Sequence, residues 1–297
     1  MKVTVLFSTR DRANVLRRTL DAMARLEPPE GGFEIIVGDN GSGDDTAAVL
    51  NSAAGRVPLR SFTESVPGKN RVLNRAVDMS RGELLVFTDD DVLPDPGWLK
   101  AYVVAAEAFP DDAVFGGAIM PDFPTSAPGW VRELSPLVQK FAFSRFDPGV
   151  PAGPMRNSPT GPNMMIRRKV FETFQYNESI GPAGKNYAMG SETELLSRLH
   201  DAGYRFIFVP KAPVRHIVRE EQTTLAWLAG RAHRLGRGQM AQTQLRGGVG
   251  KLVARSLFQA AVSFPSFAFM RFAEDRRRFW GVWHWRKSCG RLAQLRA

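Results

Sequence analysis

FEIIVGDNGSGDDTAAVLNSAA, residues 33–54, contains three signals in succession: an apolar run, a turn rich in Gly, Ser and Asp, and a helical segment. A continuous apolar run that includes β-branched residues is typical of a strand covered on both faces of a sheet. The Gly-rich turn separates this strand from the helix after it. The stretch therefore predicts one strand–turn–helix unit of an α/β fold.

The same order recurs on both sides of this unit. Residues 3–9, VTVLFST, read as a strand, and a helix follows that ends at Pro28-Pro29. Residues 68–82 predict a further helix, and ELLVFT, residues 83–88, predicts the next strand. Repeated strand–helix units indicate a mostly parallel, doubly wound sheet flanked by helices, and such sheets bind ligands at the carboxyl ends of their strands.

The second half of the chain has a different amino-acid composition and pattern. Residues 121–162 are rich in Pro and Gly, which predicts a functional lid or a substrate loop. Helical and strand patterns return in SETELLSRLHDAG, residues 191–203, and YRFIFVP, residues 204–210. After His216 the pattern is helical. We expect a catalytic domain over residues 1–219 and a basic helical region over residues 220–297.

Charge is divided unevenly between these parts. The chain has a formal net charge of +10, but from Lys211 onward there are 17 Lys and Arg against 4 Asp and Glu. Such asymmetry predicts an anionic partner for the C-terminal region, either a membrane surface or nucleic acid. The single cysteine excludes an internal disulfide framework, and with four histidines it excludes a zinc-finger cluster. MKVTVLFSTR predicts a first strand, not a secretory signal.

Three consecutive aspartates follow a buried strand in LLVFTDDDVLPDPGWL, residues 84–99. Side chains alternate along a strand, so Asp89 and Asp91 are expected to point one way and Asp90 the other. Two neighbouring carboxylates at this edge of a sheet suit Mg²⁺ or Mn²⁺, particularly when phosphates complete the coordination. The alternative is a solvated turn.

Asp39 ends the strand of residues 33–39, just before the Gly-Ser turn. A polar side chain there can hydrogen-bond a nucleobase or ribose, while the turn lets backbone N–H groups approach a ligand. The alternative is an ordinary strand-to-helix turn. The turn lacks both the GxGxxG fingerprint and the Gly-Lys-Ser/Thr of a P-loop.

With these motifs in order, the chain from about Lys2 to Arg219 resembles the family 2 glycosyltransferases, which have the GT-A fold. The resemblance rests on VGDNGSGDDT, GKNRVLNRA, GELLVFTDDDVLPDPGWL, TGPNMMIRRKVF, GSETELLSRLHDAGYRF and VPKAPVRHIV. It implies that Asp89 and Asp91 form the DXD motif, which binds a divalent cation that bridges the donor diphosphate. It also implies that Asp39 contacts the nucleotide base, and that Thr9, Arg71, Asp89 and Asp90 belong to the donor pocket.

The transfer also needs a base for the acceptor hydroxyl, and a carboxylate is suitable. Ser191 and Glu194 read as a capping box, which leaves Glu192 free at the start of the helix. The family has Glu-Asp here, with the aspartate as base, whereas this chain has Ser191-Glu192. We therefore expect Glu192 to be the base, although Glu194 remains open and Glu192 could simply favour the helix dipole.

Two further assignments follow from the resemblance. His216 matches a histidine that contacts the metal or the diphosphate after this strand. Trp130, Gly161 and Asn163 correspond to the acceptor side. His216 could equally be structural, as lone histidines often are.

The basic C-terminal region contains an apolar stretch, KLVARSLFQAAVSFPSFAFMRF, residues 251–272. Its longest uncharged run is residues 256–270, which is shorter than the roughly 20 residues that span a bilayer. Trp280, Trp283 and Trp285 lie among cations nearby. This composition predicts an interfacial anchor on an anionic leaflet; the alternative is a helical subdomain packed on the catalytic body. No recognised nucleic-acid module accompanies the charge, so nucleic acid is not expected as a partner.

The resemblance, together with these motifs, thus implies an inverting glycosyltransferase that depends on Mg²⁺ or Mn²⁺ and uses a nucleotide-sugar donor. The expected acceptor is a saccharide or lipid-linked saccharide of envelope or exopolysaccharide synthesis. The expected location is cytoplasmic and peripheral, at the inner face of the cell membrane. The alternatives are a sugar nucleotidyltransferase and a catalytically inactive, membrane-bound scaffold.

Overall fold

The computed structural model describes residues 1–182, 187–269 and 275–296, and the chain forms two compact units. The first unit consists of Met1–Asp122, Ser144–Glu178 and Glu192–Ile217. The second consists of Phe123–Phe143, Ser179–Ser191 and Val218–Ala297. The last boundary lies two residues before the expected one at 219, and the second unit also includes two earlier segments.

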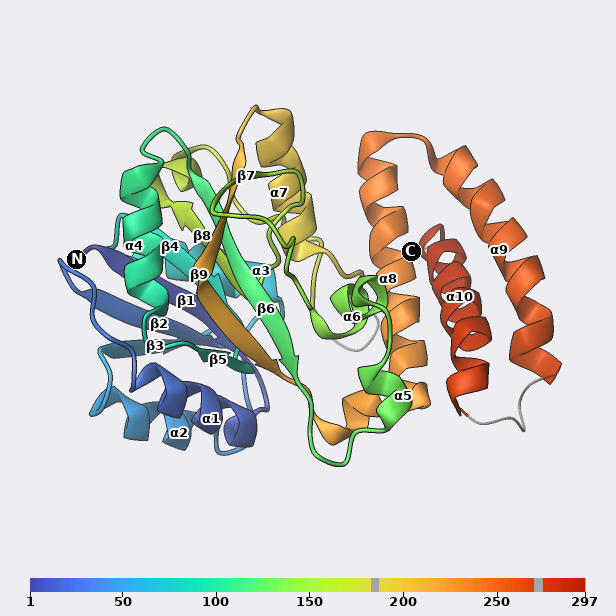
Figure 1. Ribbon diagram of the computed structural model, residues 1–297, viewed down its shortest axis with the longest axis horizontal. Helices are drawn as coiled ribbons and strands as arrows, with labels where there is room; N and C mark the ends of the chain where they lie inside the picture. Colours follow the sequence, from blue (N-terminus) through green and yellow to red (C-terminus); the bar gives the residue numbers. More distant parts are fainter. Residues whose placement is uncertain (183–186, 270–274, 297) are drawn as a thin grey trace. The chain divides into compact units, whose positions relative to one another are not determined.

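A nine-stranded sheet forms the centre of the first unit, in the order β3-β2-β1-β4-β8-β6-β9-β5, with β7 paired to β9 (Figure 1). The strands are β1 (Val3–Thr9), β2 (Phe33–Asp39), β3 (Leu59–Thr63), β4 (Leu84–Thr88), β5 (Val92–Pro94), β6 (Val114–Asp122), β7 (Gly153–Met155), β8 (Asn163–Arg167) and β9 (Phe206–Ile217).

The sheet is mixed, with a parallel half and a largely antiparallel half. Strands β1 to β4 pair in parallel, as their strand–helix units predict. Strand β8 is antiparallel to both β4 and β6, while β6 and β9 are parallel. Strands β5 and β7 are antiparallel to β9. The α/β class is confirmed, and the parallel order holds where each strand is followed by a crossover helix.

Helices cover both faces of this sheet, which explains the continuous apolar strands. Val5, Val37 and Val86 face one core, and their neighbours along the strands face the other. The first core includes α1 (Ala13–Met23), α2 (Thr46–Ala54) and α4 (Trp98–Ala108); the second includes α3 (Lys69–Met79), α7 (Ser191–Asp201) and the 3₁₀ helix η1 (Arg168–Glu172).

Asn163 is fully buried at the start of β8, and its side chain forms hydrogen bonds with several other elements. Its side-chain oxygen accepts hydrogen bonds from Trp98 Nε1 (2.8 Å) and the Tyr102 hydroxyl (2.7 Å). Its amide nitrogen donates to the carbonyl oxygens of Ala118 and Ala212. Every polar atom of the side chain is therefore used inside the core, and the expectation that Asn163 lines an acceptor cleft is wrong.

The segment of residues 121–162 is more ordered than its Pro/Gly content predicts. It includes α5 (Gly129–Arg132), α6 (Pro136–Phe143) and β7. Trp130, expected at the acceptor side, packs on Phe279 in the second unit with ring centroids 5.8 Å apart. The segment is therefore partly regular, and its role as a lid or substrate loop stays a prediction.

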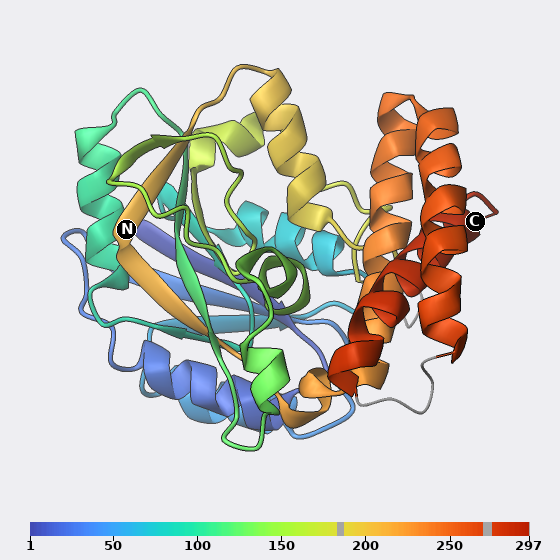
Figure 2. The same ribbon diagram turned by 45° about the vertical axis from the view of Figure 1, so that its right-hand side comes forward.

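Three long helices dominate the second unit and lie side by side (Figures 1 and 2). They are α8 (Leu225–Arg246), α9 (Val249–Phe269) and α10 (Asp275–Gln294), preceded by the 3₁₀ helix η2 (Glu220–Thr223). A Cβ atom on Gly236 would lie 2.0 Å from the carbonyl oxygen of Lys287, and one on Gly290 would lie 2.0 Å from that of His233. Glycine is therefore required for the close packing of α8 against α10.

Helix α9 differs from its neighbours in how little of it is buried. Its 21 residues are long and apolar enough to cross a membrane by length and composition, and 11% of its most apolar window is buried. One such helix is weak support for a span on its own. The helical pattern expected after His216 is confirmed.

Candidate functional site

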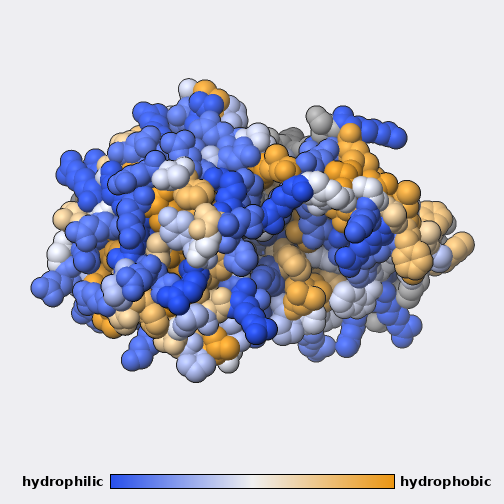
Figure 3. Space-filling view, turned by 90° about the horizontal axis from the view of Figure 1, so that it is seen from above, coloured by the Kyte–Doolittle hydropathy of each residue, from blue (hydrophilic) through white to orange (hydrophobic). Residues whose placement is uncertain are grey.

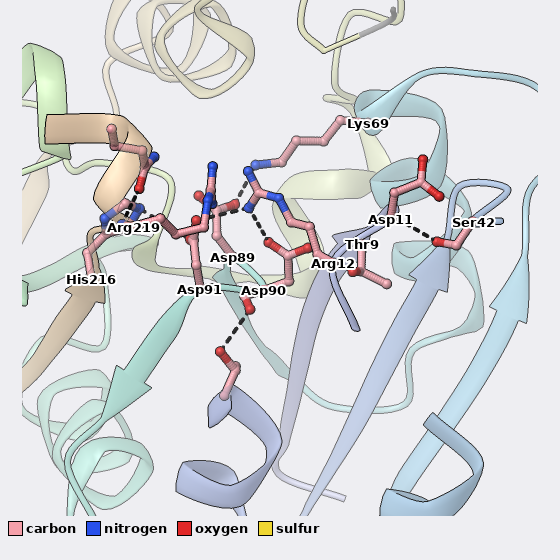
Figure 4. Close-up of polar contacts among 12 residues, drawn as sticks. Thr9, Asp11, Arg12, Ser42, Lys69, Asp89, Asp90, Asp91, His216 and Arg219 are labelled. Carbon is pink, nitrogen blue, oxygen red and sulfur yellow. Dashed lines mark hydrogen bonds and ion pairs between the residues drawn. The ribbon is translucent and has the colours of Figure 1, made fainter. Parts of the chain in front are cut away.

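The carboxyl edge of the sheet brings together Asp89, Asp91 and His216 (Figure 4). The aspartates follow β4 directly, and His216 lies near the end of β9. The backbone N–H of Ile217 donates to the carbonyl oxygen of Asp91 (2.8 Å), and Val92 is the register partner of His216. One ligand atom from each of the three side chains lies within 4.8 Å of the others.

A bulge in β9 carries His216 to this edge. Val209 pairs with Gly117 and Val214 with Ile119, so residues 210–213 have only one residue of β6 opposite them. Both prolines of this segment fall in the bulge, where the missing N–H groups break no regular ladder. The strand then resumes and reaches Ile217. His216 therefore lies within the strand; the expectation that the strand ends near Pro210 is wrong.

Asp90 is not among these three clustered side chains, and it is buried. Its carboxylate accepts hydrogen bonds from Thr9 Oγ1 (2.7 Å) and Arg12 Nη1 (2.7 Å). The same Arg12 nitrogen lies 2.9 Å from Asp91 Oδ2. The carboxylate of Asp90 raises the pKa of Arg12 against the opposing effect of burial, so Arg12 is a fixed positive charge between two aspartates.

A second cation, Lys69, reaches the aspartates from the first turn of α3. Its Nζ lies 2.5 Å from Asp89 Oδ1. Burial lowers the pKa of Lys69, but the carboxylates of Asp89 and Glu192 outweigh this and raise it above its ordinary value. Two side chains of the chain itself therefore offset part of the negative charge of the three aspartates.

Arg12 and Lys69 were not among the residues singled out from the sequence. Both follow short polar turns after strands, at the edge where the aspartates were expected, and that position is the signal that could have identified them. Arg71, which was singled out, is half exposed and pairs with Glu178 (2.8 Å). Its assignment to the donor pocket stays a prediction.

Asp39 and Thr9 are register partners at the ends of β2 and β1. Asp39 Oδ1 accepts hydrogen bonds from the backbone N–H (3.0 Å) and the hydroxyl (2.6 Å) of Ser42. The Ser42 hydroxyl oxygen also accepts a hydrogen bond from the backbone N–H of Asp11. The Asp11 carboxylate in turn accepts one from the backbone N–H of Gly43 (2.7 Å). These bonds fix the turn after β2 against the start of α1, beside Asp39.

The two glutamates at the start of α7 have different surroundings. Ser191 is the first residue of the helix, and Arg198 holds the Glu194 carboxylate through two hydrogen bonds of 2.7 and 2.8 Å. The expected capping box is therefore wrong. Glu192 is half-buried and packs beside Gly161, where an added Cβ would lie 3.1 Å from Glu192 Cδ.

Glu192 lies close enough to Lys69, the ion-pair partner of Asp89, to raise the pKa of that lysine. Besides Lys69, its carboxylate acts on Tyr176, whose pKa is raised by burial and then by Glu192 and Asp89. The site therefore combines a cluster of two carboxylates and one imidazole, a carboxylate beside it, and two cations. Carboxylate oxygens and imidazole nitrogen suit Mn²⁺, and carboxylates also suit Mg²⁺, so the residues fit such an ion.

The profile of Glycosyl transferase family 2 matches residues 4–174. The chain belongs to this family. Among curated relatives, the succinoglycan biosynthesis protein ExoM of Rhizobium meliloti is 28% identical over 226 residues, covering 74% of this chain and 69% of the relative. Glycosyltransferase AglE of Haloferax volcanii is 24% identical over 243 residues, covering 80% and 73%. The protein is therefore a glycosyltransferase.

Solved structures agree on the fold. The mannosyltransferase PcManGT of Pyrobaculum calidifontis, solved in complex with GDP-Man and Mn²⁺, has a TM-score of 0.65 at 18% identity, covering 99% of this chain and 87% of that one. S. aureus TarS, solved with UDP-GlcNAc, has a TM-score of 0.58 at 13% identity, covering 99% and 92%. These likenesses confirm the GT-A fold.

Proposed function

We propose that this glycosyltransferase is inverting and metal-dependent, and that it moves a sugar from a nucleotide-sugar donor to an acceptor hydroxyl. The observation that carries the proposal is the convergence of Asp89, Asp91 and His216 at the carboxyl edge of the sheet, with Glu192 close to the same charges. Ligands bind at this edge in open α/β sheets.

The donor is held at two places. Asp39 and Thr9 lie at the ends of neighbouring strands, where they are suited to contact the nucleoside. Asp89, Asp91 and His216 would hold Mg²⁺ or Mn²⁺, which when bound neutralises charge on the diphosphate. The complex of PcManGT with GDP-Man and Mn²⁺ supports this choice of ligand and ion. Arg71 and Asp90 complete the proposed donor pocket.

Glu192 acts on the acceptor. Its carboxylate accepts the proton of the acceptor hydroxyl as the oxygen attacks the anomeric carbon. One base and one displacement give inversion of the anomeric centre. Lys69, held by Asp89, places a positive charge beside the site, where it stabilises the leaving diphosphate.

The acceptor we propose is a saccharide or lipid-linked saccharide of envelope or exopolysaccharide assembly. The name of the succinoglycan biosynthesis relative supports a polysaccharide product. A lipid-linked acceptor agrees with a location at the inner face of the cell membrane. A catalytic domain over residues 1–219 would carry out the transfer, with residues 220–297 as the membrane-associating region.

A donor panel tests the proposal. Wild-type protein incubated with Mn²⁺, nucleotide sugars and oligosaccharide acceptors is expected to release nucleoside diphosphate and to form a product of inverted anomeric configuration. Glu192→Gln is expected to lower kcat by about 10²–10⁴-fold. Glu194→Gln is the matched control on the same helix; because Arg198 already holds Glu194, its kcat should stay within a few-fold of wild type.

Each alternative has its own result. Release of pyrophosphate from a nucleoside triphosphate would identify a nucleotidyltransferase. No turnover with any donor, together with nucleotide binding unaffected by substitutions at Asp91, would favour the inactive scaffold. If Glu194→Gln abolished turnover and Glu192→Gln did not, the assignment of the base would be wrong.

A further inference from the structure

The outer side of α9 is an apolar surface within the second unit. Three large side chains on it are more than half exposed, from 63% to 82%, and we call them the α9 face: Phe258, Val262 and Phe269. Figure 3 shows hydrophobic side chains gathered over the C-terminal helices, at the right-hand end of the view. Large apolar side chains that cluster at a protein surface indicate a contact with another molecule or a membrane.

The opposite side of α9 explains why this face points outward. Phe264 and Phe267 pack on Trp285 of α10, with ring centroids 5.0 and 5.5 Å apart. A Cβ on Gly281 would lie 2.7 Å from Ser266 Cβ, so α10 approaches α9 closely. These contacts fix one side of α9 to α10 and leave the α9 face exposed.

The charge of the three helices indicates what covers the face. They carry twelve Lys and Arg, and the one acidic residue among their described residues is Asp275. Arg291 is buried, and its guanidinium donates to the side-chain oxygens of Gln239 and Gln259, which carry no charge. A second copy of this cationic unit would be repelled, whereas an anionic surface would be attracted.

Cations adjoin the α9 face directly. Lys251 and Arg255 are exposed, and the successive spacings from Lys251 through Arg255 and Phe258 to Val262 are four, three and four residues, so all four lie on the same side of the helix. Burial, followed by the charges of Arg291 and Arg255, lowers the pKa of Lys287 to about 8. Like charges are therefore crowded here without acidic neighbours, an arrangement that a phosphate headgroup would stabilise.

We infer that α9 lies in the headgroup region of an anionic bilayer, with the α9 face in the lipid and Lys251 and Arg255 at the phosphates. The uncharged described run, residues 256–269, is about 21 Å long as a helix, shorter than a hydrocarbon core of about 30 Å. A helix of this kind, fixed along one side to α10, lies along the membrane surface. The inference deepens the membrane association proposed for residues 220–297 and rests on that part of the proposed function, not on sugar transfer.

Vesicle flotation of the full chain tests this. We expect the protein to float with phosphatidylcholine–phosphatidylglycerol vesicles, to float poorly with phosphatidylcholine alone, and to be released by high salt. Phe258→Ser with Val262→Ser should lower the partition coefficient by about tenfold or more, because apolar burial in the bilayer is lost. The matched control is Leu137→Ser with Val104→Ser, which changes side chains 65% and 64% exposed elsewhere; it should float like wild type.

A depth probe gives an independent readout. Cys289 is the one cysteine in the chain, so Val262→Cys in a Cys289→Ser background can be labelled with nitrobenzoxadiazole at a single position. Its emission should shift to the blue with anionic vesicles, and the label on Val104→Cys should not shift. Three results would overturn the inference. The first is equal flotation of both double variants, and the second is resistance of the bound protein to extraction by alkaline carbonate, as for a spanning helix. The third is a wild-type protein that does not bind vesicles and whose apparent mass in solution is halved by Phe258→Ser/Val262→Ser, as for a dimer. Donor turnover in solution is measured separately, so it does not affect this outcome.

Discussion

Three adjacent aspartates have three different environments. Asp89 and Asp91 cluster with His216, while Arg12 joins Asp90 to Asp91, so the expected opposite direction of the Asp90 side chain stays a prediction. Arg12 and Lys69 offset part of the negative charge of the aspartates, and a metal ion at this site stays a prediction. Arg12 lies 78 residues from Asp90 in the chain, and only the parallel order of β1 beside β4 brings them together.

Arg12 is expected to be important for stability as well as for the site. Arg12→Gln leaves the buried Asp90 carboxylate without its countercharge, which should lower the free energy of unfolding by about 2–4 kcal/mol. Arg10→Gln is the control, since Arg10 is half exposed and meets Asp11 at 3.6 Å; its effect should be within about 0.5 kcal/mol. Urea unfolding of both variants measures this. Equal losses would show that Arg12 does not hold Asp90.

At the scale of elements, the first half of the fold follows from sequence patterns. Residues 3–9 and 33–39 were expected as strands and are β1 and β2, because each is a continuous apolar run that faces two cores. The second half did not follow as well. Strand β9 contains Pro210 and Pro213, and prolines at these positions predict the end of a strand. The strand continues around its bulge because it pairs with β6 on both sides of it. Ser191 and Glu194 matched a capping box, but Arg198 takes Glu194 instead.

A buried carboxylate links β1, β2 and β3. Glu34 accepts hydrogen bonds from Thr4 Oγ1 (2.9 Å), Arg60 (2.8 Å) and the backbone N–H of Arg81 (2.7 Å). Burial alone raises the pKa of Glu34, but these three donors together lower it below its ordinary value of 4.5. A carboxylate whose pKa is lower in the folded state than in the unfolded state stabilises the fold at pH values above its unfolded pKa. This contribution is lost as the pH falls through the folded pKa.

Glu34→Gln is therefore expected to be destabilising in a pH-dependent way. At about pH 7 the variant should lose about 1–3 kcal/mol of unfolding free energy, and the difference from wild type should shrink below about pH 4. Glu30→Gln changes an exposed glutamate near the start of the same strand and serves as the control. Denaturant unfolding at both pH values measures the effect. A difference that grows toward acid pH would contradict the stated direction.

For the whole molecule, composition predicted more than individual motifs did. The helical pattern after His216 predicted the C-terminal helical region, and the structure adds what composition cannot give: which side of α9 is exposed. The sequence could not show that residues 123–143 join that part, because their apolar residues look the same whichever core they enter. The clustering of Asp39 and the aspartates of residues 89–91 at one edge was predictable because strand ends in a parallel sheet meet there.

The account depends on Asp89, Asp91 and His216 holding a divalent ion for a nucleoside diphosphate. Titration calorimetry of GDP and UDP, with Mn²⁺ and with chelator, tests this most directly. We predict that Mn²⁺ strengthens binding of at least one nucleotide by about tenfold or more (about 1.4 kcal/mol), and that Asp91→Asn removes this gain while the exposed Asp111→Asn and Glu192→Gln retain it. Binding that is equally strong with chelator, or a gain from Mn²⁺ that survives Asp91→Asn in a folded protein, would contradict the account.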